Sequence, residues 1–317
     1  MGFVGRRLGV SVLTLFLVSI LTFCAFRIIP GDAAVLSLGT EATDEQIQAL
    51  RAEMGLDRSF HEQYFSWLYK FISGNLGNSS RFRGASVAGI ILERLPVTLT
   101  LALISFILII IISVPVSLLS VKKENSFADR AVAVVTALNI SIPGFFLGVL
   151  FIWIFGILLK LFVPGGYVGF QENRAAFAGY LFFPALAIAL PNAALVVKFL
   201  RTSIFRELHN NYVRTARSKG GNSSYILRKH VLKNASLPAI TLLGMIAGEI
   251  LSGSIVIEQV FGIPGIGRLL LASITSRDFL LIETLLIYIA FAVILANTLA
   301  EIIIQIIDPR IRMTERV

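Results

Sequence analysis

Long apolar stretches alternate with shorter polar segments along this chain. A bilayer core of about 30 Å is crossed by about 20 mostly apolar residues in a helix. The sequence therefore predicts an all-α polytopic membrane protein with six transmembrane helices. The stretches long enough to cross are Leu8–Ile29, Leu95–Val121, Ala131–Phe162, Leu181–Leu200, Leu237–Ile257 and Leu281–Ile307.

Two of these stretches need closer inspection. Arg6 and Arg7 precede the first one, as they would in a secretory signal peptide. Its apolar run is longer than a signal core of about 7–15 residues, so we interpret it as a retained anchor. The third stretch exceeds one straight crossing and contains Pro143-Gly144. Because proline removes a backbone donor and clashes with the preceding turn, we expect one kinked span there.

Composition and charge agree with a membrane protein. The chain is 56% hydrophobic and 15% charged, with a mean hydropathy of +0.82, whereas soluble domains average about 25% charged residues. With the N-terminus inside, the inner segments hold 17 Lys and Arg against 5 acidic residues, and the outer segments hold 9 against 11. Retention of positive charge in the cytoplasm explains this asymmetry without any nucleic-acid partner and predicts that both termini are cytoplasmic.

Residues 30–94 form an extracytoplasmic segment with helix signals of its own. Thr43 with Gln46 fits a capping box, and Ser59 with Glu62 fits a second one that opens an aromatic helix. Two placements fit this aromatic helix: the outer membrane surface, or the outer mouth of the spans. The sequence leaves both open.

The second long connection, residues 198–236, contains nine Lys and Arg and one Glu. Its apolar residues recur at helical spacing as far as Ala216, which predicts one amphipathic helix. Gly220-Gly221 ends that helix, and a second amphipathic stretch reaches Lys233 before Pro238 opens the fifth span. A helix, a glycine hinge and a helix on the cytoplasmic face suit the docking of a partner protein. An interfacial helix on anionic lipid fits the same pattern.

The motif VRTARSKG (Val213–Gly220), followed by RKHVLKN (Arg228–Asn234), resembles the cytoplasmic signature of ATP-binding-cassette (ABC) importer permeases. The variant is similar to the dipeptide, oligopeptide and nickel branch, although Lys233 replaces the usual proline. Other motifs extend the resemblance along nearly the whole chain: Ile29–Asp32, Leu56–Arg58, Gln63-Tyr64, Leu76-Gly77, Leu95–Thr98, Glu258–Phe261, Pro264–Gly267 and Asp308–Arg312.

The resemblance implies the type I fold of these permeases. The expected parts are residues 1–29 with the first span, the outer helical loop domain 30–94, a five-helix core 95–307 and a cytoplasmic tail 308–317. Within the core, residues 201–236 form the expected coupling loop. The resemblance also implies a bacterial inner-membrane subunit that works with a second, homologous permease, two ABC ATPase subunits and an extracytoplasmic binding protein.

ATP and Mg would be bound by the ATPases, so we expect this chain to hold no cofactor and no catalytic residue. In accord with this, no G-x-x-x-x-G-K-[ST] phosphate loop occurs in the sequence. The substrate stays open among dipeptides, oligopeptides, glutathione-like peptides, nickel complexes and sugars, because the binding protein largely sets selectivity in such importers.

Force from the ATPases would enter through the coupling loop. We expect a helix at residues 211–219 to sit in a groove of the ATPase, with Tyr212, Val213 and Ala216 buried there and cationic residues at the rim. Gly220 would turn the chain toward the fifth span. The predicted ATPase-coupling residues are Asn211, Tyr212, Val213, Arg214, Thr215, Ala216, Arg217, Lys219 and Gly220.

Ionisable residues inside a membrane are functional candidates because their burial is costly. Glu249 in the fifth span either faces the pore or pairs between helices, and both readings stay open. The other pore candidates are Ser252 beside it and Asn297 in the sixth span. Asn297 lies four residues before Glu301, a spacing that also favours a structural hydrogen-bond pair.

Three further expectations follow from spacing. Gly244 and Gly248 leave room for another helix to approach the fifth span closely. Arg27, at the end of the first span, is expected to reach lipid headgroups. The three histidines lie in different loops, so no metal site is predicted.

Two other classes of protein were weighed against the permease. A self-contained secondary transporter would show matching broken spans in two halves of the chain, and we find no convincing match to Pro143-Gly144. An intramembrane enzyme would need a convergent nucleophile or metal set, and the sequence offers none.

Overall fold

In the computed structural model the chain divides into two compact units. Unit 1 comprises Met1–Thr98 and Pro264–Ile294, and unit 2 comprises Leu99–Ile263 and Leu295–Val317. The structure describes residues 2–28, 35, 43–79, 81–82 and 84–307. The predicted motifs Ile29–Asp32 and Asp308–Arg312, and the predicted tail 308–317, lie outside the described residues.

Unit 1 is helical throughout its described elements. Both predicted capping boxes are present, Thr43 with Gln46 and Ser59 with Glu62, and each fixes the first turn of its helix. The helices of unit 1 are α1 (Gly2–Ile28), α3 (Asp44–Met54), α4 (Phe60–Ile72), the beginning of α5 (Val87–Lys122), α12 (Ile266–Ser276) and the first half of α13 (Phe279–Ile307).

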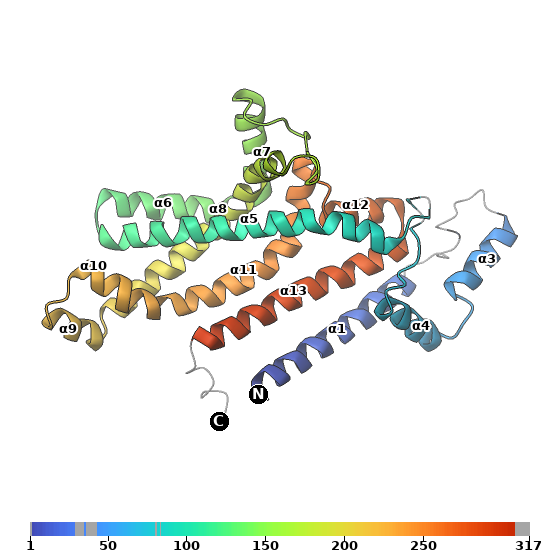
Figure 1. The fold of residues 1–317 in the computed structure, drawn as a ribbon, viewed down its shortest axis with the longest axis horizontal. Coiled ribbons are helices and arrows are strands. Elements are labelled where there is room, and N and C mark those ends of the chain that lie inside the picture. Colours follow the sequence, from blue (N-terminus) through green and yellow to red (C-terminus); the bar gives the residue numbers. More distant parts are fainter. Residues whose placement is uncertain (1, 29–34, 36–42, 80, 83, 308–317) are drawn as a thin grey trace. The chain divides into compact units, whose positions relative to one another are not determined.

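Unit 2 contains the remainder of α5 and α13 and most of the other helices (Figure 1). Two short segments, η1 and η2, have the wider π-helical turn, and each continues directly from the helix before it. The other elements are α6 (Phe127–Ser141), α7 (Gly144–Phe151), η1 (Ile152–Leu158), α8 (Arg174–Leu208), α9 (Asn211–Ser218), α10 (Ser223–Ile226), η2 (Leu227–Val231) and α11 (Leu232–Phe261).

Among the described residues, five helices are long and apolar enough to cross a membrane, and two bent helix pairs raise the number to as many as seven. The predicted six spans fall within this range. The expectation of an all-α polytopic membrane protein is therefore confirmed.

The third apolar stretch is broken rather than gently kinked. α6 ends at Ser141 and α7 begins after Pro143, and the two helices are bent by 100°. Pro143 caps α7 with an extended ψ of 138°, a conformation that cannot continue the preceding helix. The sequence predicted a disruption of the helix at Pro143-Gly144, and the structure has a break between two helices there.

One helix was not predicted at all. Residues 258–280 were expected to form an outer connection, but they include α12. Gly262, in the left-handed region at φ 70°, ends α11 and makes the turn possible. Tyr180 donates a hydrogen bond to the carbonyl of Phe261 at 2.6 Å and fixes the end of α11.

The long helix α5 shows how unit 2 is suited to a membrane. On one face Leu101, Ser105, Ile109, Ser113 and Ser117 are fully buried at four-residue spacing. The opposite face exposes Leu103, Ile107 and Ile111, which are 45–61% accessible. An extended apolar surface of this kind requires lipid or another apolar helix around it.

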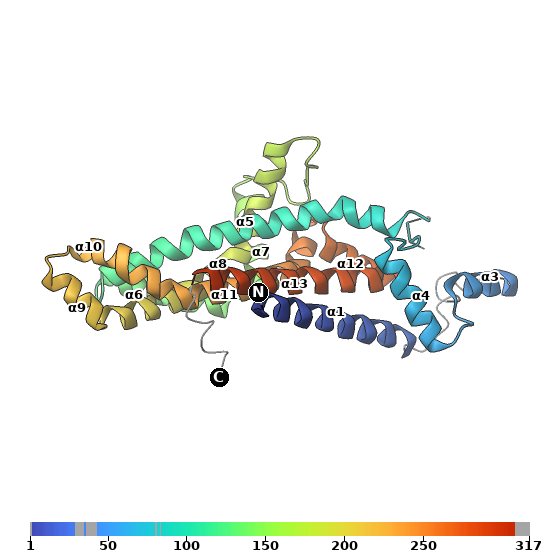
Figure 2. The same cartoon turned by 60° about the horizontal axis from the view of Figure 1, so that its bottom comes forward.

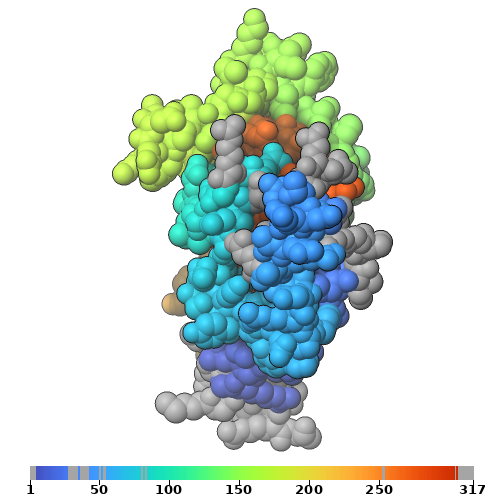
Figure 3. All heavy atoms as spheres, turned by 90° about the vertical axis from the view of Figure 1, so that its right-hand side faces the viewer, coloured from blue at the N-terminus to red at the C-terminus, as the bar shows by residue number. Residues whose placement is uncertain are grey.

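In unit 1, the aromatic helix α4 packs on α1 (Figure 2). The ring of Phe23 in α1 is fully buried and lies 5.3 Å from the rings of both Phe60 and Tyr64. Tyr64 also shares a 2.8 Å hydrogen bond with Ser19. Helix α4 is therefore held against the predicted first span by aromatic contacts and by this hydrogen bond. Figure 3 shows the side chains of α3 and α4, in blue, on the face that this view presents.

Arg27 does not reach outward to headgroups as predicted. Its guanidinium lies 3.5 Å from the carboxylate of Glu283 in α13, donates to Gln63 at 3.0 Å, and stacks over the ring of Phe23. The guanidinium of Arg27 therefore binds inside unit 1, since it pairs with the carboxylate of Glu283, which is almost completely buried.

The close helix approach predicted at Gly244 and Gly248 is confirmed, and the partner is α13. A Cβ atom on Gly244 would collide with the side chain of Ala300, and one on Gly248 would lie 2.9 Å from Asn297 Oδ1. Because only glycine leaves this room, the backbone of α11 packs directly against side chains of α13 in unit 2.

Candidate functional site: the basic elbow between α8 and α11

The candidate site is the connection between α8 and α11, residues 209–222, which we name the basic elbow. It lies at the end of unit 2 where α8 ends and α10 begins (Figure 1). The predicted single amphipathic helix is in fact two, because α8 ends at Leu208 and α9 starts after Asn210. Asn210 adopts an extended backbone with ψ 149°, which separates the two helices.

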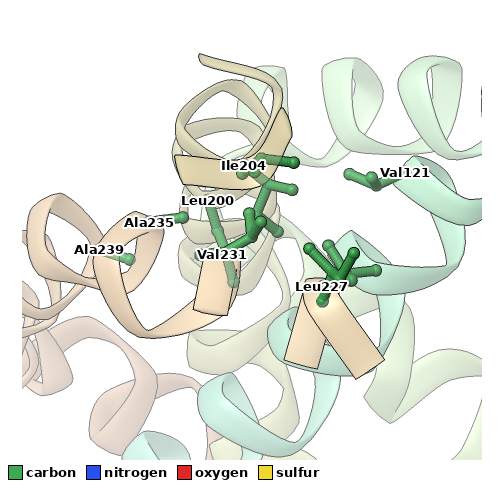
Figure 4. Close-up of a cluster of buried hydrophobic side chains, with 9 residues drawn as sticks. Val121, Leu200, Ile204, Leu227, Val231, Ala235 and Ala239 are labelled. Carbon is green, nitrogen blue, oxygen red and sulfur yellow. The ribbon is translucent and has the colours of Figure 1, made fainter. Parts of the chain in front are cut away.

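The apolar side of α9 is bound to its own chain. Val213 is fully buried, and Tyr212 and Ala216 pack against the same cluster. Figure 4 shows part of this cluster, including Ile204 of α8 and Val231 of η2. The buried members come from the ends of α5 and α8, from α9, and from the start of the fifth span: Val121, Leu200, Ile204, Val213, Ile226, Leu227, Val231, Ala235 and Ala239.

This packing corrects the expected role of the apolar residues. Val213 cannot enter a groove of an ATPase while it fills the chain's own cluster, so the side expected to be buried in the partner is used as an anchor. Buried apolar side chains of this size each contribute about 1.5–3 kcal/mol to such an anchor. The anchor fixes α9 to the ends of the spans.

Tyr212 adds a polar contact to the anchor. Its hydroxyl donates to Glu207 Oε2 at 2.8 Å, across the break between α8 and α9. The phenol of Tyr212 is a hydrogen-bond donor at neutral pH, and burial raises its pKa further above its ordinary value. Glu207 also accepts from the side-chain amide of Asn210 at 2.8 Å, and one carboxylate thereby braces both sides of the turn.

The glycine corner ends α9 as the sequence predicted. Gly220 has φ 79° and donates its N–H to Arg217, and Gly221 donates to the carbonyl of Ala216. These are the two bonds of a Schellman motif. A Cβ atom on Gly221 would lie 2.9 Å from that same carbonyl, so both glycines are required, for different reasons.

The other side of α9 is exposed and basic. Its exposed side chains belong to Asn211, Arg214, Thr215, Arg217 and Ser218, and Lys219 follows directly. From residue 210 to residue 222 the sequence contains no acidic residue. This surface therefore suits an acidic surface of a partner protein or the anionic headgroups of lipids.

The elbow connects rigidly to two spans. α8 runs without a break through 35 residues, and α10, η2 and α11 follow one another from Ser223 to Phe261. The expectation that Pro238 opens the fifth span is wrong, because Pro238 lies inside α11. The proline is tolerated in a helical segment that already begins upstream at Ser223.

The predicted pore residues are only partly described. Glu249 is exposed on α11, and Asn297 is exposed on α13 with its side chain against Gly248. The backbone of Ser252 is part of α11, but its side chain lies outside what the structure describes.

The sequence reasoning missed two buried acidic residues that pair with arginines. Asp129 of α6 pairs with Arg201 of α8 in unit 2, and Glu283 of α13 pairs with Arg27 in unit 1. Glu283 was detectable as an ionisable residue inside the sixth apolar stretch. Asp129 had a weaker signal, its position three residues after the helix-capping Ser126.

The fold and the elbow together define a polytopic helical membrane protein whose spans are connected through an exposed basic helix. Residues 113–313 match the sequence profile described as the inner membrane component of binding-protein-dependent transport systems. Residues 1–102 match the profile of the N-terminal part of such membrane components. The chain belongs to this family and is a permease subunit of an ABC importer.

Named relatives cover almost the full chain. A Brucella ovis protein named as a peptide permease is 35% identical over 313 residues, 98% of each chain. A Sinorhizobium fredii protein named as a peptide ABC transporter permease is 32% identical over 97% of this chain and 98% of its own length. The oligopeptide transport system permease protein AppB of Bacillus subtilis is 32% identical over 96% of this chain and 98% of its own length.

Proposed function

We propose that this permease imports peptides, and that α9 is the element through which ATPase subunits move its spans. A second, homologous permease completes the translocation pathway, two ABC ATPases bind ATP and Mg, and an extracytoplasmic binding protein delivers the peptide. The chain itself carries out no catalytic step and holds no cofactor.

One observation carries this proposal: α9 is anchored on its apolar side and free on its basic side. Val213 is fully buried among residues from the ends of α5, α8 and the fifth span, whereas Arg214 and Arg217 are exposed. A helix that served only to lie on lipid would direct its apolar side outward into the acyl chains. The observed arrangement instead favours contact between a polar partner surface and the basic side.

The choice of substrate comes from the relatives. The named proteins of Brucella ovis, Sinorhizobium fredii and Bacillus subtilis are all named for peptides. Peptides are therefore the substrates proposed here, in place of the nickel complexes and sugars that the sequence left open.

The orientation follows from charge. The elbow belongs to the segments that hold 17 Lys and Arg against 5 acidic residues, so we place it and both termini in the cytoplasm. This orientation puts the elbow on the side where ATP is available, and the membrane is the bacterial inner membrane.

The test uses the exposed side of α9. The double substitution Arg214→Glu with Arg217→Glu is expected to abolish co-purification of the ATPases in mild detergent and uptake of a labelled tripeptide, while membrane insertion remains normal. The control is Arg174→Glu, which makes the same type of substitution at a single exposed residue at the other end of α8, about 50 Å away at 1.5 Å per residue.

Two results would contradict the proposal. Normal tripeptide uptake by the double variant would exclude α9 as the force-receiving element. Uptake by the purified wild-type chain without any ATPase would instead support the self-contained secondary transporter.

Glu249 is the proposed contact for a cationic group of the peptide, because it is exposed on α11 within a candidate span. Glu249→Gln keeps the size of the side chain and removes its charge. We expect this variant to lose more of the wild-type uptake rate for peptides with a free amino terminus than for N-acetylated peptides of the same sequence. Equal losses for both would assign Glu249 to structure.

A further inference from the structure

The carboxylate of Asp129 connects three helices of unit 2. It lies in the first turn of α6 with only 8% of its side chain exposed. Ser120 of α5 donates to Oδ1 at 2.5 Å, and the backbone N–H of Asn125 donates to Oδ2 at 3.2 Å. Arg201 of α8 donates to both oxygens, Nε to Oδ1 at 3.2 Å and NH2 to Oδ2 at 3.1 Å. We name Asp129, Ser120 and Arg201 the three-helix clamp.

The clamp adjoins the cluster that anchors α9. Val121, the residue after Ser120, is a buried member of that cluster. On α8 the guanidinium of Arg201 lies 4.8 Å from the ring centre of Phe205, and Phe205 packs against the cluster. Figures 1 and 2 both show the turn between α5 and α6 at the same end of unit 2 as α9. Contacts therefore run continuously from α9 through the cluster to the clamp.

Directional bonds make the clamp different from the apolar packing beside it. A bidentate arginine–carboxylate pair fixes both distance and orientation, whereas burial of apolar surface is non-directional. The start of α6 is therefore held to α5 and α8 in one geometry. At its other end α6 meets the break at Pro143, where the chain bends by 100° into α7.

We propose that Asp129, Arg201 and Ser120 are positioning residues for transport, which transmit the movement of α9 to α6. In this proposal the elbow and the adjoining ends of α5, α6 and α8 move as one body, and the chain flexes at the Pro143 break. The inference rests on the proposed function, in which α9 receives force from the ATPases. It adds a mechanical route into the third span.

The first experiment uses the complete importer in proteoliposomes. Asp129→Asn keeps the shape of the side chain and a partner for Ser120. Arg201→Gln removes the guanidinium that donates to both oxygens of Asp129. For each we expect ATP hydrolysis per assembled complex to stay close to wild type while peptide import falls at least about fivefold, the lower end of usual coupling between sites. The matched control is Arg174→Gln, an exposed arginine at the start of α8 that lies outside both the clamp and the coupling loop and should leave import unchanged.

Loss of import in proportion to hydrolysis, or to the amount of assembled complex, would show that the clamp is only structural and would overturn the proposal. Import at the wild-type ratio in both variants would overturn it as well. Failure of the wild-type chain to assemble with ATPases would be a failure of the proposed function itself, and it is read from the same preparation before any variant is compared.

A second measurement leaves the clamp intact and so does not depend on whether the variants Asp129→Asn and Arg201→Gln fold. Spin labels are placed at Val134→Cys on α6 and Thr202→Cys on α8, both exposed, in a Cys24→Ser background. The distance between them is expected to stay constant between the nucleotide-free and the nucleotide-trapped importer. A second pair, Val134→Cys with Val149→Cys on α7, reports across the Pro143 break and is expected to change. A shift in the first pair as large as in the second would overturn the proposal.

Discussion

Two buried ion pairs, one in each unit, differ in how completely the carboxylate is bound. In unit 2, Asp129 receives hydrogen bonds from a serine hydroxyl, a backbone amide and two atoms of Arg201, all at 2.5–3.2 Å. In unit 1, the contact between Arg27 and Glu283 is 3.5 Å long, and Arg27 makes its shorter bond to Gln63 at 3.0 Å.

The difference shows that burial alone does not make an ion pair a rigid connection. Removing a carboxylate from water is repaid only when geometry is good and its remaining lone pairs are satisfied. Asp129 meets this condition and holds three helices in register. Arg27 divides its interactions among the acid of α13, the amide of Gln63 in α4 and the ring of Phe23, so its bond to Gln63 helps seat α4 on α1 while its contact with Glu283 stays long.

The largest effect is expected from breaking the pair in unit 2. Asp129→Leu leaves Arg201 two-thirds buried without its acid, and we expect a loss of about 3 kcal/mol in the free energy of unfolding. SDS titration of the purified protein in mixed micelles, followed by circular dichroism, measures this quantity.

The double substitution Asp129→Leu with Arg201→Met is the control, because replacing both partners by apolar side chains is often neutral. It should recover most of the lost stability. A double variant as unstable as the single one would show that the loss reflects poor packing at α6 and not an unpaired cation.

A smaller loss is expected from Arg27→Met in unit 1. This change removes the bond to Gln63 and the contact with Phe23, whose ring centre lies 4.6 Å from the guanidinium of Arg27. It also leaves Glu283 without its cation. We expect a loss of about 2 kcal/mol, typical of one charged hydrogen bond. The same titration measures it, and protease accessibility of α4 should rise in parallel. A loss as large as that of Asp129→Leu would remove the contrast between the two pairs.

Much of this architecture was available from the sequence because it depends on local signals. Span positions follow from apolar length, both capping boxes from residue spacing, and the corner of the elbow from Gly220-Gly221. What was missed depends on partners far away in the chain. Asp129 and Arg201 are separated by 71 residues of unrelated pattern, and Arg27 and Glu283 by more than 250.

The elbow shows the same limit in one helix. The apolar spacing of Tyr212, Val213 and Ala216 correctly predicted a helix with one buried side. Periodicity indicates that one side of a helix is buried but not which residues bury it. The sequence analysis assigned that contact to a partner protein, whereas in the structure residues of α8 and of the fifth span bury Val213. The ATPase-coupling role of the exposed residues remains a prediction.

Ser120→Ala tests whether the serine contributes to the clamp. It removes the 2.5 Å bond to Asp129 and the 2.8 Å bond that Ser120 accepts from Arg201 Nε, but it leaves the two bonds from Arg201 to Asp129. We therefore expect a loss of about 1 kcal/mol. Ser105→Ala is a matched control, a buried serine of α5 whose hydroxyl donates to its own helix at the Leu101 carbonyl. If both variants lose the same amount in the SDS titration, Ser120 acts through packing and not through Asp129.

The smallest effect is expected from Glu283→Gln. The substitution keeps the shape of the side chain and an oxygen that can accept from Arg27, and it removes a charge whose burial is costly. Since a 3.5 Å contact recovers little of that cost, we expect the free energy of unfolding to change by less than about 0.5 kcal/mol. A loss above that of Ser120→Ala would mean that Glu283 is bound as firmly as Asp129, and the distinction between a clamp in unit 2 and a loose pair in unit 1 would have to be abandoned.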